Sequence, residues 1–160
     1  MVVDENNIPV ANAEVLVANT TYFTNTKGFF NTPKLNLDKY ISTVKITKAG
    51  YFKAYRSFSA NATKNFVSIK LIPKTLIGSF SSSTAGSVSL SNSSQISFQA
   101  NSINIKSTGA AYTGTVNVYS AYIDPTSADI ATKVPGSFIG QDATNLYALK
   151  SAGMIAVELE

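Results

Sequence analysis

The chain has 160 residues, with 13 lysines and arginines, 9 aspartates and glutamates, and a formal net charge of +4. It has no histidine and no cysteine, which removes the commonest general base and excludes thiolate nucleophiles, zinc–thiolate sites and disulfides. Serine, threonine and asparagine together number 50 residues, a composition that favours strands with polar outward faces over helices.

The charge is unevenly distributed along the chain. Residues 1–74 hold 10 basic and 4 acidic residues, whereas residues 75–160 hold 3 basic and 5 acidic residues. Such a division can steer a polyanion toward the first half. The lysines are scattered rather than clustered, however, as on a surface that keeps a domain soluble. We therefore expect no nucleic-acid partner.

Residues 1–73 consist of short alternating runs separated by turn residues. The runs at 13–17, 43–47, 51–58 and 67–71 predict strands with one buried face. Residues 25–28 predict a hairpin turn in which Gly28 supplies a positive φ. Asp4, Glu5, Asn6 and Asn7 offer oxygen atoms to a calcium ion but lack the further ligands and the glycine of an EF-hand loop, so a solvated turn is the preferred interpretation. The pattern indicates one β-sandwich domain over residues 1–73.

The composition changes after residue 73. Nine of the sixteen residues 79–94 are serine, which taken alone resembles a flexible linker. Val88 and Leu90 nevertheless alternate with serines, as in a strand. We interpret residues 74–86 as a Ser-rich linker or edge that leads into a second β-domain over residues 87–160.

The second domain is predicted to be smaller and antiparallel, either complete or truncated. Its longest strand is expected at 113–123 and ends before Asp124 and Pro125, since proline cannot join a central ladder. Residues 126–148 are expected to be irregular, with one short helix around 145–150. Ile155, Val157 and Leu159 are expected to share one face of a last strand. Because the chain starts and stops within strand patterns, we interpret it as a fragment without its targeting segment.

The segment 51–58 holds the best candidate for a binding site. Alternation predicts that Tyr51, Lys53 and Tyr55 point outward, while Phe52, Ala54 and Phe58 point inward. Exposed aromatic rings beside polar groups bind sugars by stacking and hydrogen bonding. The simpler alternative is a core face backed by an ordinary solvated face.

Other candidate sites are weaker. Asp124, Asp129 and Asp142 lie in the irregular region, where they either bind calcium or cap turns and short helices. No two acids are singled out as a catalytic pair, and the serines lack a histidine partner and a Gly-x-Ser-x-Gly elbow. We therefore expect no catalytic residues, no cofactor and no enzymatic activity.

Three segments carry a resemblance to a known family. They are V-x-D-x-x-x-x-P-V-x-x-A-x-V at 2–15, T-N-T-K-G-F-F at 24–30 and K-A-G-Y at 48–51. Together they resemble the carboxypeptidase regulatory-like family. The resemblance implies a transthyretin-like, or prealbumin-like, seven-stranded sandwich in the first domain, with no catalytic residues. The second half is similar to β-domains that follow such modules in envelope proteins of the Bacteroidetes.

These observations lead to three functional expectations. The first is an all-β protein of two tandem domains that acts as a non-catalytic spacer in a larger secreted or envelope-anchored bacterial protein, such as a lipoprotein. The second is a glycan- or protein-binding adhesion module that uses the exposed aromatics of the 51–58 strand. The third is a periplasmic extension of an outer-membrane receptor, which the absence of a plug-like sequence after residue 72 disfavours.

The resemblance also implies a location and partners. It places the protein outside the cell or in the periplasm, anchored at the outer membrane. The expected partners are other domains of the same polypeptide, with a glycan or a cell-envelope protein as the alternative. Membrane contact is expected only through an anchor outside this sequence.

Overall fold

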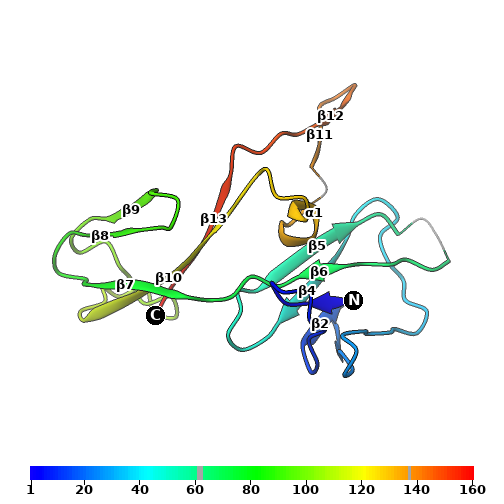
Figure 1. The fold of residues 1–160 in the computed structure, drawn as a ribbon, viewed down its shortest axis with the longest axis horizontal. Helices are drawn as coiled ribbons and strands as arrows, with labels where there is room; N and C mark the ends of the chain where they lie inside the picture. Colours follow the sequence, from blue (N-terminus) through cyan, green and yellow to red (C-terminus); the bar gives the residue numbers. More distant parts are fainter. Residues whose placement is uncertain (61–62, 137) are drawn as a thin grey trace. The chain divides into compact units, whose positions relative to one another are not determined.

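The computed structural model describes residues 1–60, 63–136 and 138–160 (Figure 1). The fold is almost entirely β, with 39% strand and 3% helix in several antiparallel sheets, which confirms the predicted all-β class. The single turn of described helix is α1, Ile130–Lys133. Among the described residues, no helix is long and apolar enough to cross a membrane.

The chain divides into two compact units, each built from two segments. The first unit comprises Met1–Pro73 and Ile123–Gly153, and the second comprises Lys74–Tyr122 and Met154–Glu160. This grouping differs in two places from the sequence-based division into 1–73, 74–86 and 87–160. Residues 123–153 belong with the first unit, and most of 74–86 is strand and turn of the second unit.

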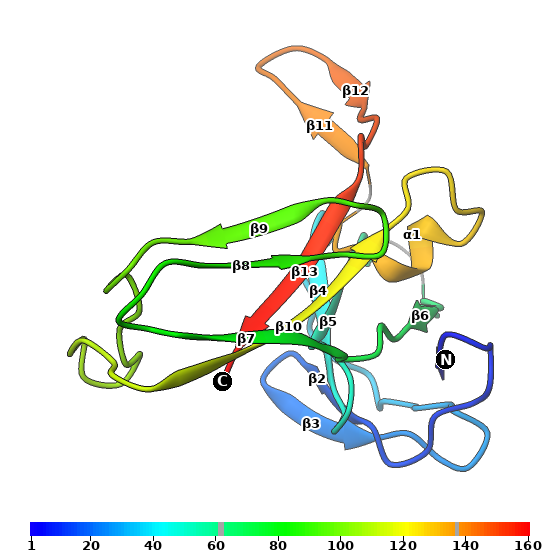
Figure 2. The same cartoon turned by 60° about the vertical axis from the view of Figure 1, so that its left-hand side comes forward.

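The first unit is organised around a four-stranded antiparallel sheet in the order β3-β2-β4-β5. Its strands are β2 (Glu14–Val17), β3 (Thr20–Phe23), β4 (Ser42–Thr47) and β5 (Ala54–Phe58). A second, parallel pair joins β1 (Val2–Val3) to β6 (Ile69–Lys70). The unit also contains α1 and a hairpin of β11 (Ile139–Gln141) and β12 (Leu146–Ala148), which is seen most clearly in Figure 2.

Alternation along the strands builds the core of the first unit. Successive side chains of a strand point to opposite faces. Val15 and Val17 therefore share the buried face of β2, and Val44 and Ile46 share the buried face of β4 with Ser42. Val15 on β2 lies opposite Ile46 on β4, and both are fully buried. The parallel pair adds its own apolar residues to the same cluster, which consists of Val2, Val10, Ala13, Val15, Val17, Val44, Ile46, Ile69 and Leu71.

The predicted turn at 25–28 is confirmed, and its chemistry is local. The side-chain oxygen of Asn25 accepts hydrogen bonds from the backbone N–H groups of Lys27 and Phe29. Gly28 has a φ of 71°, and its carbonyl accepts a bond of 2.8 Å from the N–H of Val2. The turn therefore anchors β1 as well as reversing the chain.

The second unit contains a three-stranded sheet and a hairpin. The sheet order is β13-β10-β7, and β8 pairs with β9. The bounds are β7 (Leu76–Ser81), β8 (Gly86–Ser89), β9 (Gln95–Phe98), β10 (Thr115–Ile123) and β13 (Met154–Leu159). Phe80 of β7 stacks on Phe98 of β9 with ring centroids 4.6 Å apart, and Val116 and Val118 of β10 are buried.

The predicted helix around 145–150 is wrong. Residues 146–148 are β12, which pairs with β11, and the short helix lies instead at 130–133. Asp142 explains the difference, because its carboxylate accepts the N–H groups of Thr144 and Asn145 and so closes a tight turn between two strands.

Candidate binding surface

The outer face of the four-stranded sheet is a partly exposed surface of the first unit. The strand register places Leu16 beside Lys45, and Lys45 beside Tyr55. We use the name outer sheet face for the side chains that alternate with the core residues, namely Glu14, Leu16, Thr21, Phe23, Lys45, Thr43, Thr47, Tyr55 and Ser57.

The outer sheet face combines an aromatic ring, a cation and hydroxyl groups. Residues directly opposite on an antiparallel pair have Cβ atoms about 4.5–5.5 Å apart, so Tyr55 and Lys45 are neighbours. Next to them the hydroxyls of Thr43 and Ser57 lie 3.3 Å apart. Tyr55 is 44% exposed and Phe23 at the other end of the sheet is 63% exposed. Such a set can offer a ring for stacking and hydroxyls for hydrogen bonding.

The structure separates the three predicted ligand-binding residues. Tyr55 is exposed on β5 and Lys53 is exposed just before it. Tyr51 is partly buried and packs against the core cluster, so the expectation that it points outward is wrong. It lies in an isolated bridge to Pro73, ahead of the regular strand, where the alternation of β5 does not extend. Burial, with a smaller effect of the charges of Glu5 and Asp4, raises the pKa of the Tyr51 hydroxyl.

The residues predicted to point inward do so. The structure also identifies one outward residue, next to Tyr55, that the sequence pattern did not single out. Phe52 is buried, while Ala54 and Phe58 pack against the core cluster. Lys45 is the residue that sequence reasoning missed, although it alternates with Val44 and Ile46. Only the register of β4 against β5 shows that its neighbour is Tyr55.

Two open cavities lie elsewhere in the first unit. One of about 330 Å³ is lined by Arg56, Phe58, Phe66 and Val67 among others. Arg56 donates a hydrogen bond of 2.8 Å to the carbonyl of Gly136, so its guanidinium is already engaged. The other, of about 350 Å³, is lined mainly by residues 125–130 and 149–151 together with Phe138.

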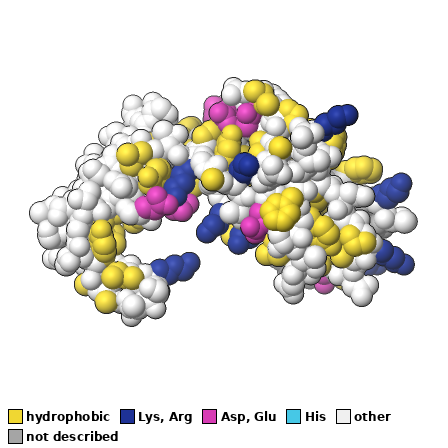
Figure 3. Space-filling model, turned by 90° about the horizontal axis from the view of Figure 1, so that it is seen from below, with side chains coloured by type: hydrophobic (Ala, Val, Ile, Leu, Met, Phe, Trp, Pro, Cys, Tyr) yellow, Lys and Arg dark blue, Asp and Glu magenta, His cyan; other side chains and the backbone are white. Residues whose placement is uncertain are grey.

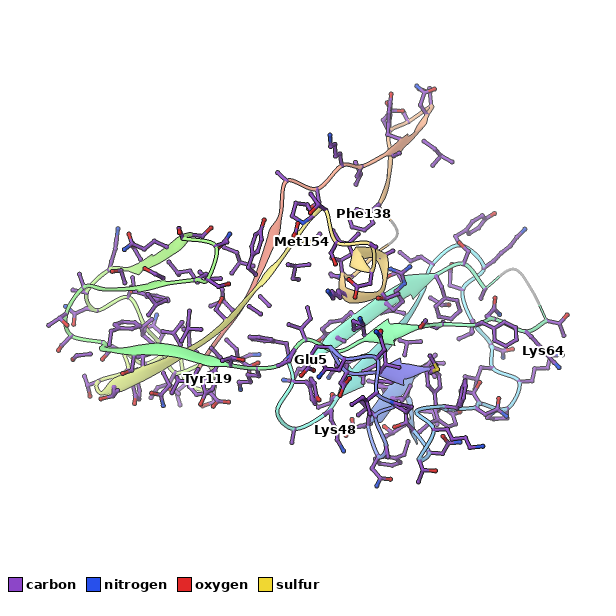
Figure 4. All side chains as sticks on the ribbon, viewed as in Figure 1. Glu5, Lys48, Lys64, Tyr119, Phe138 and Met154 are labelled. Atoms are coloured by element: carbon purple, nitrogen blue, oxygen red, sulfur yellow. The ribbon has the colours of Figure 1, made fainter. Side chains whose placement is uncertain are left out.

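On one face of the molecule, the lysine and arginine side chains do not form a continuous band (Figure 3). On the face shown in Figure 3, lysine and arginine side chains lie singly or in pairs among polar and hydrophobic ones. Lys48, labelled in Figure 4, donates from its Nζ to the carbonyls of Ala11 and Asn12 at 2.8 and 3.3 Å. This lysine therefore contributes to the structure of the loop.

The three aspartates considered as calcium ligands are each engaged locally. Asp124 accepts the N–H and hydroxyl of Thr126, and Asp142 accepts the hydroxyl of Tyr147 in addition to its turn N–H groups. Asp129 forms ion pairs instead. In the part of the chain that the structure describes, no group of three or more acidic side chains is gathered as a metal site. Asp4 likewise accepts the N–H groups of Asn6 and Ile8, as a turn residue does.

Asp129 lies at the centre of the most densely charged cluster of the first unit. Its carboxylate is 2.7 Å from the Nζ of Lys133 and 2.5 Å from the Nζ of Lys70, and it accepts the Ser127 hydroxyl. The Lys70 side chain is only 7% exposed. Lys133, Lys70 and Ser127, in that order, hold the pKa of Asp129 well below its usual range. The cluster ties the segment after β10 to β6.

We expect Asp129→Asn to lower the free energy of unfolding by about 1 kcal/mol at pH 7, because the buried ammonium of Lys70 loses its charged partner while part of the cluster faces water. The native contribution is complete above the ordinary carboxyl pKa of 3.8 and is lost as the pH falls through the lower folded value. Urea unfolding at pH 7 and pH 3 measures the free energy of unfolding of the native chain and of the variant. The difference between the two free energies should be smaller at pH 3 than at pH 7. A gap that widens in acid would contradict the ion pair.

We expect the β11–β12 hairpin to survive acid below the ordinary carboxyl range. The N–H of Thr144, the hydroxyl of Tyr147 and the N–H of Asn145 lower the pKa of Asp142 to about 2. The turn is therefore stabilised above pH 3.8 and loses that stabilisation as the pH falls through about 2. The NMR signals of residues 142–147 should shift between these two pH values in the native chain. The same signals should not shift in Asp142→Asn, because the asparagine side chain keeps a hydrogen-bond acceptor that does not titrate. Equal shifts in both proteins would exclude Asp142 as the cause.

Comparisons with known proteins identify no relative. No family model matches the chain, and neither a curated protein nor a solved structure matches it.

Proposed function

We propose that this chain is a non-catalytic structural spacer module of a larger secreted or envelope-anchored bacterial protein. The observation that carries the proposal is the placement of the two terminal strands. β1 is built into the first unit and β13 into the second. Tension applied at Met1 and Glu160 therefore has to pass through both units, as it does in a spacer.

The parallel pairing of β1 with β6 is suited to resist such tension. The carbonyls of Met1 and Val3 accept the N–H groups of Ile69 and Leu71 at 3.0 and 2.8 Å. Parallel strands pulled at opposite ends slide along each other, so that their evenly spaced bonds are strained together rather than one after another. A force applied at Met1 and at the residue after Pro73 pulls β1 from its first residue and β6 from its last residue, so the two parallel strands are pulled from opposite ends.

The charged groups support a structural role. The resolved pKa shifts of the described Asp and Glu side chains are downward, and that of Lys74 is upward. Each shift stabilises the charged form through an ion pair or a turn. A general acid needs the opposite, a carboxyl whose pKa is raised. Among the described residues, every buried polar side-chain atom has a hydrogen-bond partner, which suits a scaffold.

The family and the location belong to the same proposal. The first unit is assigned to the carboxypeptidase regulatory-like, transthyretin-like class. Support comes from the antiparallel sheet and the β1–β6 pair around one core, which together comprise six strands in the described part of residues 1–73; the proposed class has seven. With that class comes the expected setting, a multi-domain protein of the bacterial surface or periplasm whose partners are its own neighbouring domains.

A pulling experiment tests the spacer. The chain has no cysteine, so handles can be attached through introduced thiols. One protein carries a cysteine added ahead of Met1 together with Lys74→Cys, which pulls β1 and β6 from opposite ends. The matched control carries Glu5→Cys with Lys74→Cys, which pulls both strands from the same end and peels them apart. We expect a clearly higher rupture force from the first pair, and equal forces would remove the mechanical basis of the proposal.

The outer sheet face favours a second candidate, a glycan- or protein-binding module. The observation is the exposed Tyr55 ring beside Lys45 and the Thr43–Ser57 hydroxyl pair. A glycan array and a pull-down from envelope proteins should give signals that Tyr55→Ala abolishes. Tyr40→Ala is the control, since Tyr40 is 78% exposed but lies outside the sheet. An empty array and an empty pull-down with the native chain would reject this candidate.

A further inference from the structure

The last strand of the second unit exposes a row of apolar side chains. Ile155, Val157 and Leu159 alternate along β13 and are 42%, 45% and 36% exposed. β13 is at the edge of the sheet β13-β10-β7, and both ribbon views show it running beside β10 (Figures 1 and 2). An edge strand offers unpaired N–H and C=O groups, and here it also offers an apolar row.

β13 lacks the basic residues, proline and glycine with which proteins protect an edge. Its residues, MIAVEL, include no proline, lysine, arginine or glycine, the residues that usually block pairing. The opposite edge of the same sheet, β7, is interrupted by a register shift. β5, at the edge of the other sheet, carries Arg56. β13 therefore combines an open edge with an apolar row, and Glu158 is its single charged residue.

The hydrogen bonds to β10 show which groups of β13 are free to pair. Asn117 and Glu160 exchange two backbone bonds of 2.7 and 3.0 Å. In an antiparallel ladder every second residue then faces β10, and the alternate residues Ile155, Val157 and Leu159 direct their N–H and C=O groups to the open edge. The same register places Leu159 opposite the buried Val118, so the apolar row continues the buried face of β10.

The acidic side chains of this segment are held on the other face. Lys74 forms ion pairs with Glu158, at 3.0 Å, and with Glu160. Its Nζ also lies 4.6 Å from the ring centre of Tyr119, which is labelled on β10 in Figure 4. The contact between Lys74 and Glu160 raises the pKa of Lys74 and lowers the pKa of Glu160. Both carboxylates are thereby held by Lys74 on the face opposite the apolar row, where one ammonium group offsets one of the two negative charges.

We propose that β13 pairs antiparallel with β13 of a second copy of this chain, with the two-fold axis at Val157. Val157 then lies opposite the partner's Val157, and Ile155 lies opposite the partner's Leu159. All three outward residues of each copy donate and accept a backbone bond, as the free edge requires. The two apolar rows meet on one face of a continuous sheet.

The positions of the two glutamates favour this register. With the axis at Val157, Glu158 lies opposite the partner's Ala156, and Glu160 lies opposite the partner's Met154. No carboxylate faces another. Moving the axis to Leu159 would place Glu158 opposite the partner's Glu160, and moving it to Glu158 would place that residue opposite its own copy, both of which are unfavourable. An axis at Ile155 also keeps the carboxylates apart, but it pairs only one outward residue of β13 with β13 of the partner. The axis at Val157 is therefore the register that pairs all three outward residues without a like-charge contact.

Cross-linking tests the register directly, because the native chain has no cysteine. Residues in a hydrogen-bonded antiparallel pair have Cα atoms about 5.5 Å apart, within the range of about 4.4–6.8 Å that a disulfide spans. Val157→Cys should therefore form a covalent dimer under mild oxidation. Ile155→Cys is the matched control, since it lies about 14 Å along the sheet from its own copy. A mixture of Ile155→Cys and Leu159→Cys proteins should cross-link with each other.

Sedimentation of the native chain over a concentration series gives the second measurement. We expect a monomer–dimer equilibrium that Val157→Lys shifts to monomer, because two ammonium groups would then meet at the axis. Ile8→Lys, at a site 58% exposed in the first unit, should leave the equilibrium unchanged. A native chain that is monomeric throughout, or Ile155→Cys that cross-links as well as Val157→Cys, would overturn the proposal.

Discussion

Replacing Ile46 by alanine should lower the free energy of unfolding by about 2–5 kcal/mol, the usual cost of removing a fully buried isoleucine side chain and leaving a cavity. Ile46 is fully buried near the end of β4. It lies between Val15 of β2 and Ala54 of β5, so the cavity would open in the middle of the four-stranded sheet, where the backbone is held on both sides and cannot collapse. Urea unfolding followed by circular dichroism measures the loss.

Ile41→Ala is the matched control for this change. It removes the same atoms from a side chain that is 65% exposed, and substitutions at such positions change stability by no more than about 0.5 kcal/mol. If both variants lost the same stability, burial in the core cluster would not be the source of the effect.

Replacing Gly28 by alanine should cost about 2 kcal/mol or more. The φ of 71° at Gly28 is unfavourable for any residue with a Cβ. A Cβ there would also lie 2.4 Å from the carbonyl oxygen of Val2, which is backbone and cannot move without disturbing β1. The expected result is a lower urea midpoint together with weaker protection of the amide of Val2 in hydrogen exchange.

Gly50→Ala separates the cost of the positive φ from the cost of the close contact with Val2. Gly50 also has a positive φ, 83°, but no atom lies within 4 Å of the added Cβ. It should therefore show the conformational cost alone and leave the exchange of Val2 unchanged. A Gly50→Ala variant as unstable as Gly28→Ala would show that the contact with Val2 contributes nothing.

Local patterns predict the strands of the first unit well. Alternation in 13–17 and 43–47 identifies β2 and β4 and their buried valines, because a strand with one face in water repeats every two residues whatever its partner is. The turn at 25–28 is predicted for the same kind of reason, since the contacts of Asn25 span no more than four residues.

Tyr51 shows where such reasoning ends. Its position in the alternating sequence predicts that the ring points outward. The backbone of Tyr51 instead forms an isolated bridge with Pro73, a residue that the local pattern does not include. The binding surface has the same limitation. Tyr55 can be identified from the sequence, but its neighbour Lys45 depends on the register between β4 and β5.

Residues 123–153 show the limit at the level of the whole unit. The contacts that tie this segment to the first unit include Lys70 with Asp129 and Arg56 with Gly136, which are 59 and 80 residues apart. Nothing near Asp129 or Gly136 in the chain indicates these partners, so a division by chain order groups the segment differently from the contacts of the folded chain.

The sequence by itself therefore determined the all-β class, most strands and the turn chemistry, since each depends on residues within a few positions of one another. The tertiary structure alone decided which strands pair, which segments join each unit and which apolar row stays open. Ile155, Val157 and Leu159 illustrate the difference. Their shared face follows from period-two alternation, but their exposure follows from β13 lying at the edge of its sheet, a position that only the long-range pairing with β10 creates.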